Sequence, residues 1–537
     1  MKPDAEIKAT PTAEAAPAAA ERTVRETTRG AAIITLAKGW FLVTGFAQPL
    51  LLTRVLHTEG YGLYGVVLNV VSILNNVVVA GSIQAMSHAV TEGGPAALRR
   101  GLRIHFGVGL TLAGGLVAVA GPLGAGALHD ARLPSLLRIG AVVVFNYSVY
   151  AALVGALNGQ RRFRDQAALD MTFATLRTAL VIGVAAVGFG VAGALVGFAL
   201  ASTIILALAL WLSRAALRPG ATAAPGDEPA PALAVAPVTF GAFAARYGRF
   251  FAPVLVYQLA LNLVLQSDLL VFKAILARRA VTAAASGLAV NDLVGIYKAV
   301  QNFAFLPYQL LLAVTFVIFP VVSRATLEGD RDTTARFVAG ATRFSLLALG
   351  AMLAVLTGLP RGVLRIAYRP PFDEGYAALR LLSVAQGCFA LSVISTTILV
   401  AAGRTRQASL LMGAMLMMVT AGNVAGLTFG PGGTGALAAT AAGTLTGCAL
   451  GLVLIGLWVK KTFGAFVSPV TVLRVALSTT VAAATVAAVP LQGKVATLGL
   501  AGVAVAVYAA CIALSRELTG EEIGRIVRVL RKTGPKG

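Results

Sequence analysis

Long apolar stretches alternate with short polar segments along almost the whole chain. Because an α-helix needs about 20 apolar residues to cross a bilayer, each stretch has the length of a transmembrane span. The pattern predicts an all-α polytopic membrane protein with about 14 transmembrane helices. The predicted spans are residues 31–53, 61–86, 104–128, 136–157, 167–188, 191–213, 250–272, 294–321, 338–358, 377–402, 407–429, 435–458, 470–489 and 495–515.

A segment rich in Pro, Ala and Gly, RPGATAAPGDEPAPALAVAP at residues 218–237, interrupts this pattern after the sixth span. Such a composition cannot pack into a core, so it indicates a linker between two halves. The predicted units are a disordered cytoplasmic tail (1–29), an N-lobe of helices 1–6 (30–214), a cytoplasmic linker (215–240), a C-lobe of helices 7–12 (241–459), helices 13 and 14 (468–515), and a basic amphipathic cytoplasmic tail (516–537).

The two halves repeat short phrases in the same order. GLYGVVLN (62–69) matches GIYKAVQN (295–302), and SHAVTEG (87–93) matches SRATLEG (323–329) at nearly the same offset. Spans 1–6 are therefore predicted to be duplicated as spans 7–12. Because six is even, both copies enter the membrane from the same side, as in transporters with parallel repeats related by an axis along the membrane normal.

Composition agrees with this architecture: the chain is 57% hydrophobic and 12% charged, with a mean hydropathy of +0.82. Its net charge of +22 fits basic cytoplasmic loops that face anionic lipid better than it fits nucleic-acid binding. With both termini inside, the inner segments hold 29 of the 44 Lys and Arg residues and the outer loops hold 11. The bias predicts cytoplasmic N- and C-termini.

The sequence offers no chemistry for catalysis. The three cysteines are far apart in apolar segments, the four histidines stand singly near span ends, and no phosphate-binding loop is present. We therefore predict no enzyme activity, no catalytic residues, no metal site and no cofactor apart from a coupling H⁺ or Na⁺.

Polar side chains form stripes on four predicted helices. In the eighth span Lys298 is followed by Gln301 and Asn302 at helical spacings, and Asn69 aligns with Asn302 across the repeat. Charges within a bilayer are costly unless they face a polar cavity. The predicted cavity residues on these stripes are Lys38, Asn69, Asn76, Gln266, Lys298, Gln301 and Asn302, while snorkelling to an interface is the alternative for Lys38 and Lys298.

Four more charged residues are candidates. Arg177 lies in the middle of the fifth span and either lines the cavity or pairs with Asp170. Arg246 and Arg249 lie at the predicted cytoplasmic entrance, where the general inside bias explains them equally well. Asp268, near the outer end of the seventh span, is a candidate for ion coupling or for an ion pair with Arg54 or Lys273.

Three stretches resemble a known family. LTRVLHTEGYGLYG (52–65), the run from Asp268 through VGIYKAVQ (294–301) to FPVVSRATLEGD (319–330), and LRIAYRPPFDEGYAALRLLSV (364–384) are similar in order and spacing to polysaccharide-unit flippases of the MOP (multidrug/oligosaccharidyl-lipid/polysaccharide) superfamily. The resemblance implies two six-helix lobes with two further helices. It also implies a polyprenyl-pyrophosphate-linked glycan as cargo, moved across a bacterial inner membrane among its lipids, with polysaccharide polymerase machinery as a candidate partner.

Cations and amides on the polar stripes suit the pyrophosphate and sugar hydroxyls of such a cargo. Two alternatives share the fold, namely the lipid II flippase of peptidoglycan synthesis and a MATE-type cation or drug antiporter. From another class, the alternative is a membrane enzyme or scaffold such as a polysaccharide polymerase or ligase. A catalytic cluster of His, Glu and Arg on an outer loop would support that class, and the sequence shows none.

Overall fold

The computed structural model describes residues 15–217, 239–282, 287–312, 331–490 and 493–517, and it is helical without strands over these ranges. Ten helical stretches within them are long and apolar enough to cross a membrane. The helices are α1 (Ala15–Gly121), α2 (Leu133–Gly159), α3 (Phe163–Val184), α4 (Gly190–Leu217), α5 (Phe240–Thr282), α6 (Gly287–Ala304), α8 (Arg331–Gly358), α9 (Pro360–Ala367), α10 (Tyr376–Ala401), α11 (Thr405–Phe429), α12 (Gly435–Phe463), α13 (Pro469–Ala487) and α14 (Lys494–Leu514).

Helix α1 comprises three successive helices separated by two breaks. The backbone leaves helical geometry at His57 and at Gly94, and the three parts correspond to the predicted spans 31–53, 61–86 and 104–128. A similar break at Gly188 and Gly190 separates α3 from α4. Residues 313–321 of the predicted span 294–321 lie outside the described residues, so the exact count of 14 stays a prediction.

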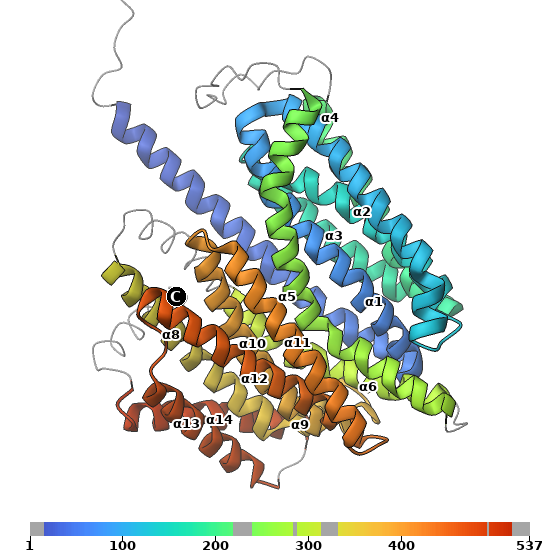
Figure 1. Ribbon diagram of the computed structural model, residues 1–537, viewed down its shortest axis with the longest axis vertical. Helices are drawn as coiled ribbons and strands as arrows, with labels where there is room; N and C mark the ends of the chain where they lie inside the picture. Colours follow the sequence, from blue (N-terminus) through green and yellow to red (C-terminus); the bar gives the residue numbers. More distant parts are fainter. Residues whose placement is uncertain (1–14, 218–238, 283–286, 313–330, 491–492, 518–537) are drawn as a thin grey trace, which may run out of the picture.

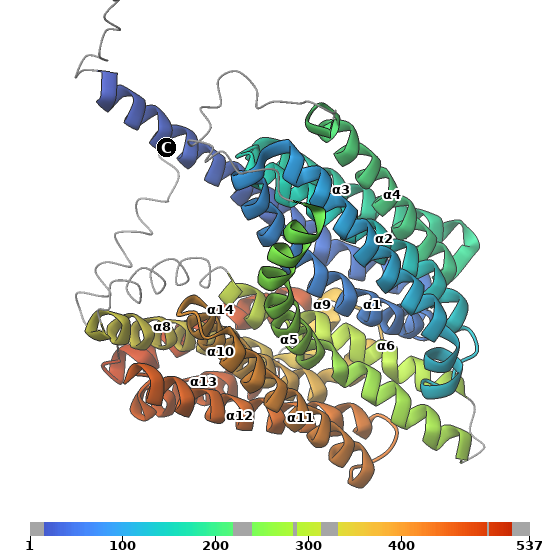
Figure 2. The ribbon, with the colours of Figure 1, turned by 45° about the horizontal axis from the view of Figure 1, so that its top comes forward.

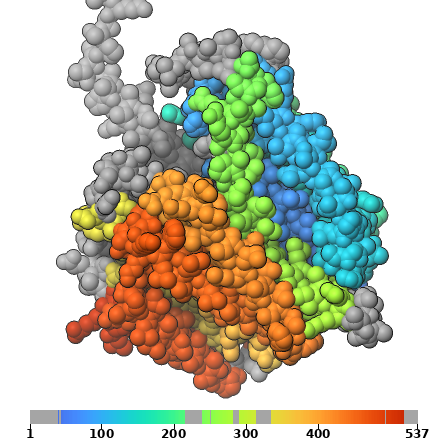
Figure 3. Space-filling view, viewed as in Figure 1, coloured from blue at the N-terminus to red at the C-terminus, as the bar shows by residue number. Residues whose placement is uncertain are grey.

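The helices form two groups. Helices α1–α4, coloured blue to green, lie on one side, and α8–α14 lie on the other (Figures 1 and 2). Helix α5 runs as a green band along the boundary between them (Figure 3). The groups meet where α1 contacts α5 and α6, and α13 and α14 pack on α8, away from this boundary. The expected fold of two lobes with two additional helices is confirmed.

Two glycines related by the sequence repeat make reciprocal contacts between the lobes. A Cβ atom on Gly62 would lie 2.1 Å from the carbonyl oxygen of Asn291, and one on Gly295 would lie 2.0 Å from that of Thr58. The offset is the same for both pairs, because Gly295 follows Gly62 by as many residues as Asn291 follows Thr58. The contact therefore has the pseudo-twofold symmetry expected of parallel repeats, and only glycine allows so close an approach.

The predicted boundaries differ from the structure at the N-terminus. Helix α1 begins at Ala15, so residues 15–29 of the segment expected to be disordered are helical. Residues 1–14, most of the linker, and the basic tail from residue 518 lie outside the described ranges. The division into six units thus remains a prediction.

Candidate functional site

The predicted polar stripes meet at the boundary between the lobes. Lys298 of α6, 9% exposed, donates from Nζ to Asn69 Oδ1 of α1 at 2.7 Å and to Gln301 Oε1 at 3.3 Å. Opposite it lies Gly65, where a Cβ atom would stand 2.7 Å from Lys298 Cγ. The Lys298 ammonium of one lobe thus hydrogen-bonds the Asn69 amide of the other lobe. The absence of a side chain at Gly65 leaves room for the lysine.

Asp268 of α5 belongs to the same cluster and is 1% exposed. Its carboxylate accepts hydrogen bonds from Tyr297 Oη at 2.9 Å, from Gln301 Nε2 at 2.8 Å and from the backbone N–H of Leu269. Among the described residues no cation forms a salt bridge with Asp268, so the ion-pair interpretation is wrong for Lys273, which lies beside Asp130 instead. Gln301 links the buried carboxylate to the buried ammonium of Lys298.

A second row of amides joins α1 to α5. Asn69 Nδ2 donates to the carbonyl oxygen of Gln266 at 3.2 Å, and Asn76 Nδ2 donates to Asn262 Oδ1 at 3.0 Å. The Gln266 side chain is also buried. We call the residues Asn69, Asn76, Gln266, Asp268, Lys298 and Gln301 the interlobe cluster.

Asn302 lies on the same helix as Lys298 but contacts aromatic residues. Its Nδ2 donates to Tyr61 Oη of the N-lobe at 2.8 Å and to Tyr368 Oη at 3.0 Å. Phe372 packs against both tyrosine rings. These three rings are buried, so Asn302 joins the two lobes through an aromatic contact.

Arg177 of α3 lies apart from the interlobe cluster, inside the N-lobe. Its guanidinium lies over the ring of Phe198, 4.7 Å from the centroid, near Tyr147. Its Nε atom is buried and has no hydrogen-bond partner among the described residues. The structure thus places Arg177 in an aromatic environment and not beside Lys298. The Lys38 side chain is outside the part of the structure that describes side chains.

The two arginines of the predicted entrance have different surroundings. Arg246 forms an ion pair with Glu92 of α1 at 2.8 Å, whereas Arg249 is exposed. Nearby, Tyr247 Oη lies 2.7 Å from Nε2 of His105, which is fully buried and has Ser82 Oγ 3.2 Å from its Nδ1. His105 therefore does not stand alone in the structure, and these contacts join the first half of α5 to the N-lobe.

A further polar cluster between the lobes was not predicted. Asp130 Oδ2, in the segment between α1 and α2, accepts from Asn291 Nδ2 at 3.0 Å and from Lys273 Nζ at 3.4 Å. Lys273 also donates to Asn291 Oδ1, and Arg132 binds both Asp130 and Glu59. We call Asp130, Lys273 and Asn291 the outer latch, because the charge count predicts that this end of the bundle faces outside. Beside it Thr58 donates to Asp292 across the same boundary.

The outer latch is expected to stay intact over the physiological pH range. Burial alone would raise the pKa of Asp130, but hydrogen bonds from Arg132 and Asn291 outweigh it and lower the pKa from 3.8 to about 2. A carboxylate with a depressed pKa contributes its full stability above the ordinary value and loses it as the pH falls toward the lowered one. Disulfide formation between Thr58→Cys and Asp292→Cys, in a chain without its three native cysteines, is normalised at each pH to that of a reference cysteine pair within one lobe, because the reactive thiolate becomes scarce at low pH. The normalised yield should be constant from pH 8 to pH 5, and its progressive loss over that interval would contradict this assignment.

Comparisons with known proteins agree with this architecture. Residues 27–326 match the model of a family described as polysaccharide biosynthesis protein. No curated protein shows significant similarity to the sequence. Among solved structures, the lipid II flippase MurJ in an inward-closed conformation matches with a TM-score of 0.67 and 13% identity, covering 90% of this chain and 98% of that one.

Transporters with other roles share the same fold. A MATE structure in the straight conformation matches with a TM-score of 0.56 and 15% identity, covering 81% of this chain and 95% of that one. A MOP-superfamily transporter from Pyrococcus furiosus matches with a TM-score of 0.52 and 14% identity, over 81% and 95% of the two chains. Such low identities establish the fold alone. Because the family model covers more than half of the sequence, the chain belongs to the polysaccharide biosynthesis protein family, with the multi-pass fold of MOP-superfamily transporters.

Proposed function

We propose that this protein is a flippase that moves a polyprenyl-pyrophosphate-linked oligosaccharide from the inner to the outer leaflet of a bacterial inner membrane. The observation that carries the proposal is the buried Lys298, which contacts Asn69 across the boundary between the lobes of a polysaccharide biosynthesis family member. The Lys298 ammonium binds a polar group of the opposite lobe. It therefore does not extend to the membrane surface, as a snorkelling lysine would.

The interlobe cluster is suited to two states. When the lobes are in contact, Lys298, Asn69 and Gln301 satisfy one another's hydrogen bonds. Separation of the lobes breaks the Lys298–Asn69 contact and leaves an ammonium and an amide facing the opening. Buried polar groups without partners are costly, so a cargo that supplies phosphate oxygens and hydroxyls would stabilise the separated state.

The proposed cycle uses alternating access. In the described structure the lobes are held together at the predicted outer end by the outer latch and the contact of Gly62 with Asn291. The cargo headgroup would enter from the cytoplasmic side while the prenyl tail stays in the bilayer between the lobes. Opening of the latch would then release the headgroup outside, and Asp268 is the proposed site for a coupling H⁺ or Na⁺.

Depletion of the protein in its own host tests the proposal. We expect completed oligosaccharide-lipid to accumulate on the cytoplasmic face while surface polysaccharide is lost, as measured by lipid extraction, glycan labelling of intact spheroplasts, and mass spectrometry. Re-expression from a plasmid should restore both pools. Unchanged pools of carrier-linked glycan under full depletion would refute the flippase assignment.

The second candidate is a lipid II flippase, favoured by the fold similarity to MurJ over 90% of the chain. The same extraction distinguishes the two, because lipid II would then accumulate instead of a polysaccharide repeat unit. Increased sensitivity to cationic dyes with normal carrier-lipid pools would point to the antiporter alternative. We also propose that both termini are cytoplasmic and that polysaccharide polymerase machinery is a partner of this protein.

A further inference from the structure

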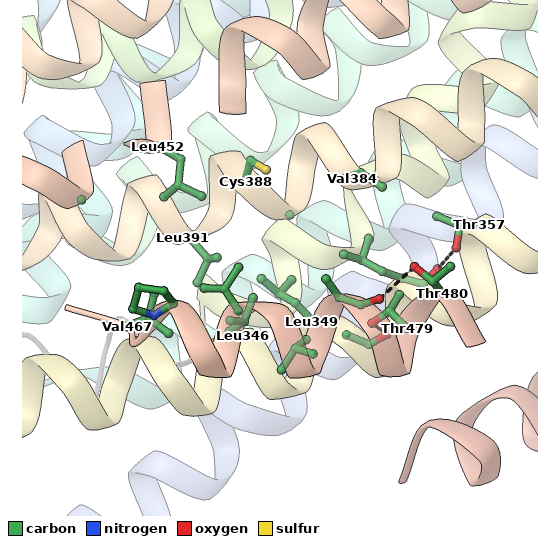
Figure 4. Close-up of a pocket in the computed structure, with 18 of the residues that line it drawn as sticks. Leu346, Leu349, Thr357, Val384, Cys388, Leu391, Leu452, Val467, Thr479 and Thr480 are labelled. Atoms are coloured by element: carbon green, nitrogen blue, oxygen red, sulfur yellow. Dashed lines mark hydrogen bonds between the residues drawn. The ribbon is translucent and has the colours of Figure 1, made fainter. Parts of the chain in front are cut away.

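An apolar groove runs along α13 (Figure 4). Its volume is about 800 Å³, and its walls come from α8, α10, α12 and α13. Helix α13 packs on α8 and α14, and across the groove it faces α10 and α12. Apart from Lys460, Arg380 and three threonines, the side chains that line it are apolar or are the thiol of Cys388.

Helix α10 separates this groove from the interlobe cluster. Its residues Val384, Cys388 and Leu391 line the groove (Figure 4). Elsewhere on the same helix, Phe389 packs against Tyr308 with ring centroids 5.2 Å apart, and Thr396 lies within hydrogen-bond distance of Tyr257 of α5. A molecule in the groove therefore occupies a place distinct from a cargo headgroup at Lys298.

The end of the groove that is predicted to face the cytoplasm is basic. Lys460, in the last turn of α12, lines the groove and is exposed, and its ammonium has no ion pair or hydrogen bond to any described residue. The adjacent Lys461 does not line the groove, and its ammonium lies 6.0 Å from the ring centroid of Trp458. Two arginines near the lining residues of α8 and α13, Arg343 and Arg474, both form ion pairs with Glu517.

We propose that the groove binds one anionic glycerophospholipid of the inner leaflet. Its phosphate would pair with Lys460, and an acyl chain would lie along α13 against Leu346 and Val475. An apolar groove within a bilayer is filled by hydrocarbon, and an unpaired lysine at its inner end selects an anionic headgroup. The acyl chain would occupy the space between α13 and the α10–α12 wall, bracing α13 and α14 on the C-lobe. This proposal does not rest on the identity of the cargo.

Native mass spectrometry of the full chain tests this site. The protein is delipidated in detergent and titrated with phosphatidylglycerol and phosphatidylcholine of identical acyl chains. We expect a preferential phosphatidylglycerol adduct that Lys460→Gln weakens about fivefold, the effect of one lysine near an anionic headgroup. Lys461→Gln is the matched control and should leave the adduct unchanged.

A second pair of variants tests the groove itself. Ala476 lines it, so Ala476→Phe should fill it and remove the adduct, whereas Leu477→Phe, on an exposed part of α13 outside the lining, should not. Equal retention of the two phospholipids, or equal effects of Lys460→Gln and Lys461→Gln, would overturn the proposal. Displacement of phosphatidylglycerol by an equimolar polyprenyl phosphate would also overturn it, by identifying the carrier as the occupant. If Ala476→Phe does not fold, the comparison of Lys460→Gln with Lys461→Gln decides between the outcomes.

Discussion

Replacing Lys298 with glutamine is expected to lower glycan export about tenfold while leaving protein abundance unchanged. The Lys298 ammonium is buried and bonded to Asn69 of the opposite lobe. Glutamine keeps an amide donor, on a side chain one bond shorter, but removes the charge. A hydrogen bond from a charged group to phosphate contributes about 1.5–3 kcal/mol, and each 1.4 kcal/mol corresponds to a factor of ten. The measurement is export of labelled glycan in depleted cells that express the variant.

Two further variants make this result specific. Lys461→Gln removes an exposed lysine far from the cluster and should export normally. Lys298→Arg retains the charge and should export better than Lys298→Gln if charge is what the cargo requires. Wild-type export by Lys298→Gln at wild-type abundance would remove Lys298 from the cargo site. The fold and the lipid groove would be unaffected.

The interlobe cluster can be predicted from the sequence because the pattern that indicates it lies within single helices and their repeat. Helical spacing places Lys298 and Gln301 on one face, and the repeat aligns their helix with the one that carries Asn69. Parallel repeats must meet at their common axis, so polar stripes on equivalent helices face each other there. The structure brings Asn69, Lys298 and Gln301 together at this axis.

The outer latch could not be predicted in the same way. Asp130, Lys273 and Asn291 come from three segments near span ends, where charged and polar residues are common and usually face water or headgroups. Only the docking of the lobes buries them together. The contact between His105 and Tyr247 could not be predicted either. It depends on where α5 crosses the N-lobe, and neither segment has a periodic sequence pattern that indicates it.

Replacing Gly62 with alanine is expected to separate the outer ends of the lobes. The new Cβ atom would lie 2.1 Å from the backbone oxygen of Asn291, which cannot move aside as a flexible side chain could. Overpacking of this kind costs about 1–3 kcal/mol, so the ratio of closed to open outer ends should fall about tenfold. Cross-linking between Thr58→Cys and Asp292→Cys should decrease accordingly, and export should decrease with it because the cycle needs both states. Gly295→Ala makes the reciprocal contact with Thr58 and should act in the same way.

The control for this prediction lies in the third of the successive helices that make up α1. A Cβ atom added to Gly114 of α1 would have no described atom within 4 Å, so Gly114→Ala should leave both cross-linking and export at wild-type levels. Alanine also has a higher helix propensity than glycine. A loss of cross-linking or export in Gly62→Ala could therefore not be explained by a weaker helix. Normal cross-linking in both Gly62→Ala and Gly295→Ala would show that the lobes do not close through this glycine pair. Loss of export with normal cross-linking would instead place the defect in a step after closure, such as the rearrangement that breaks the Lys298–Asn69 contact.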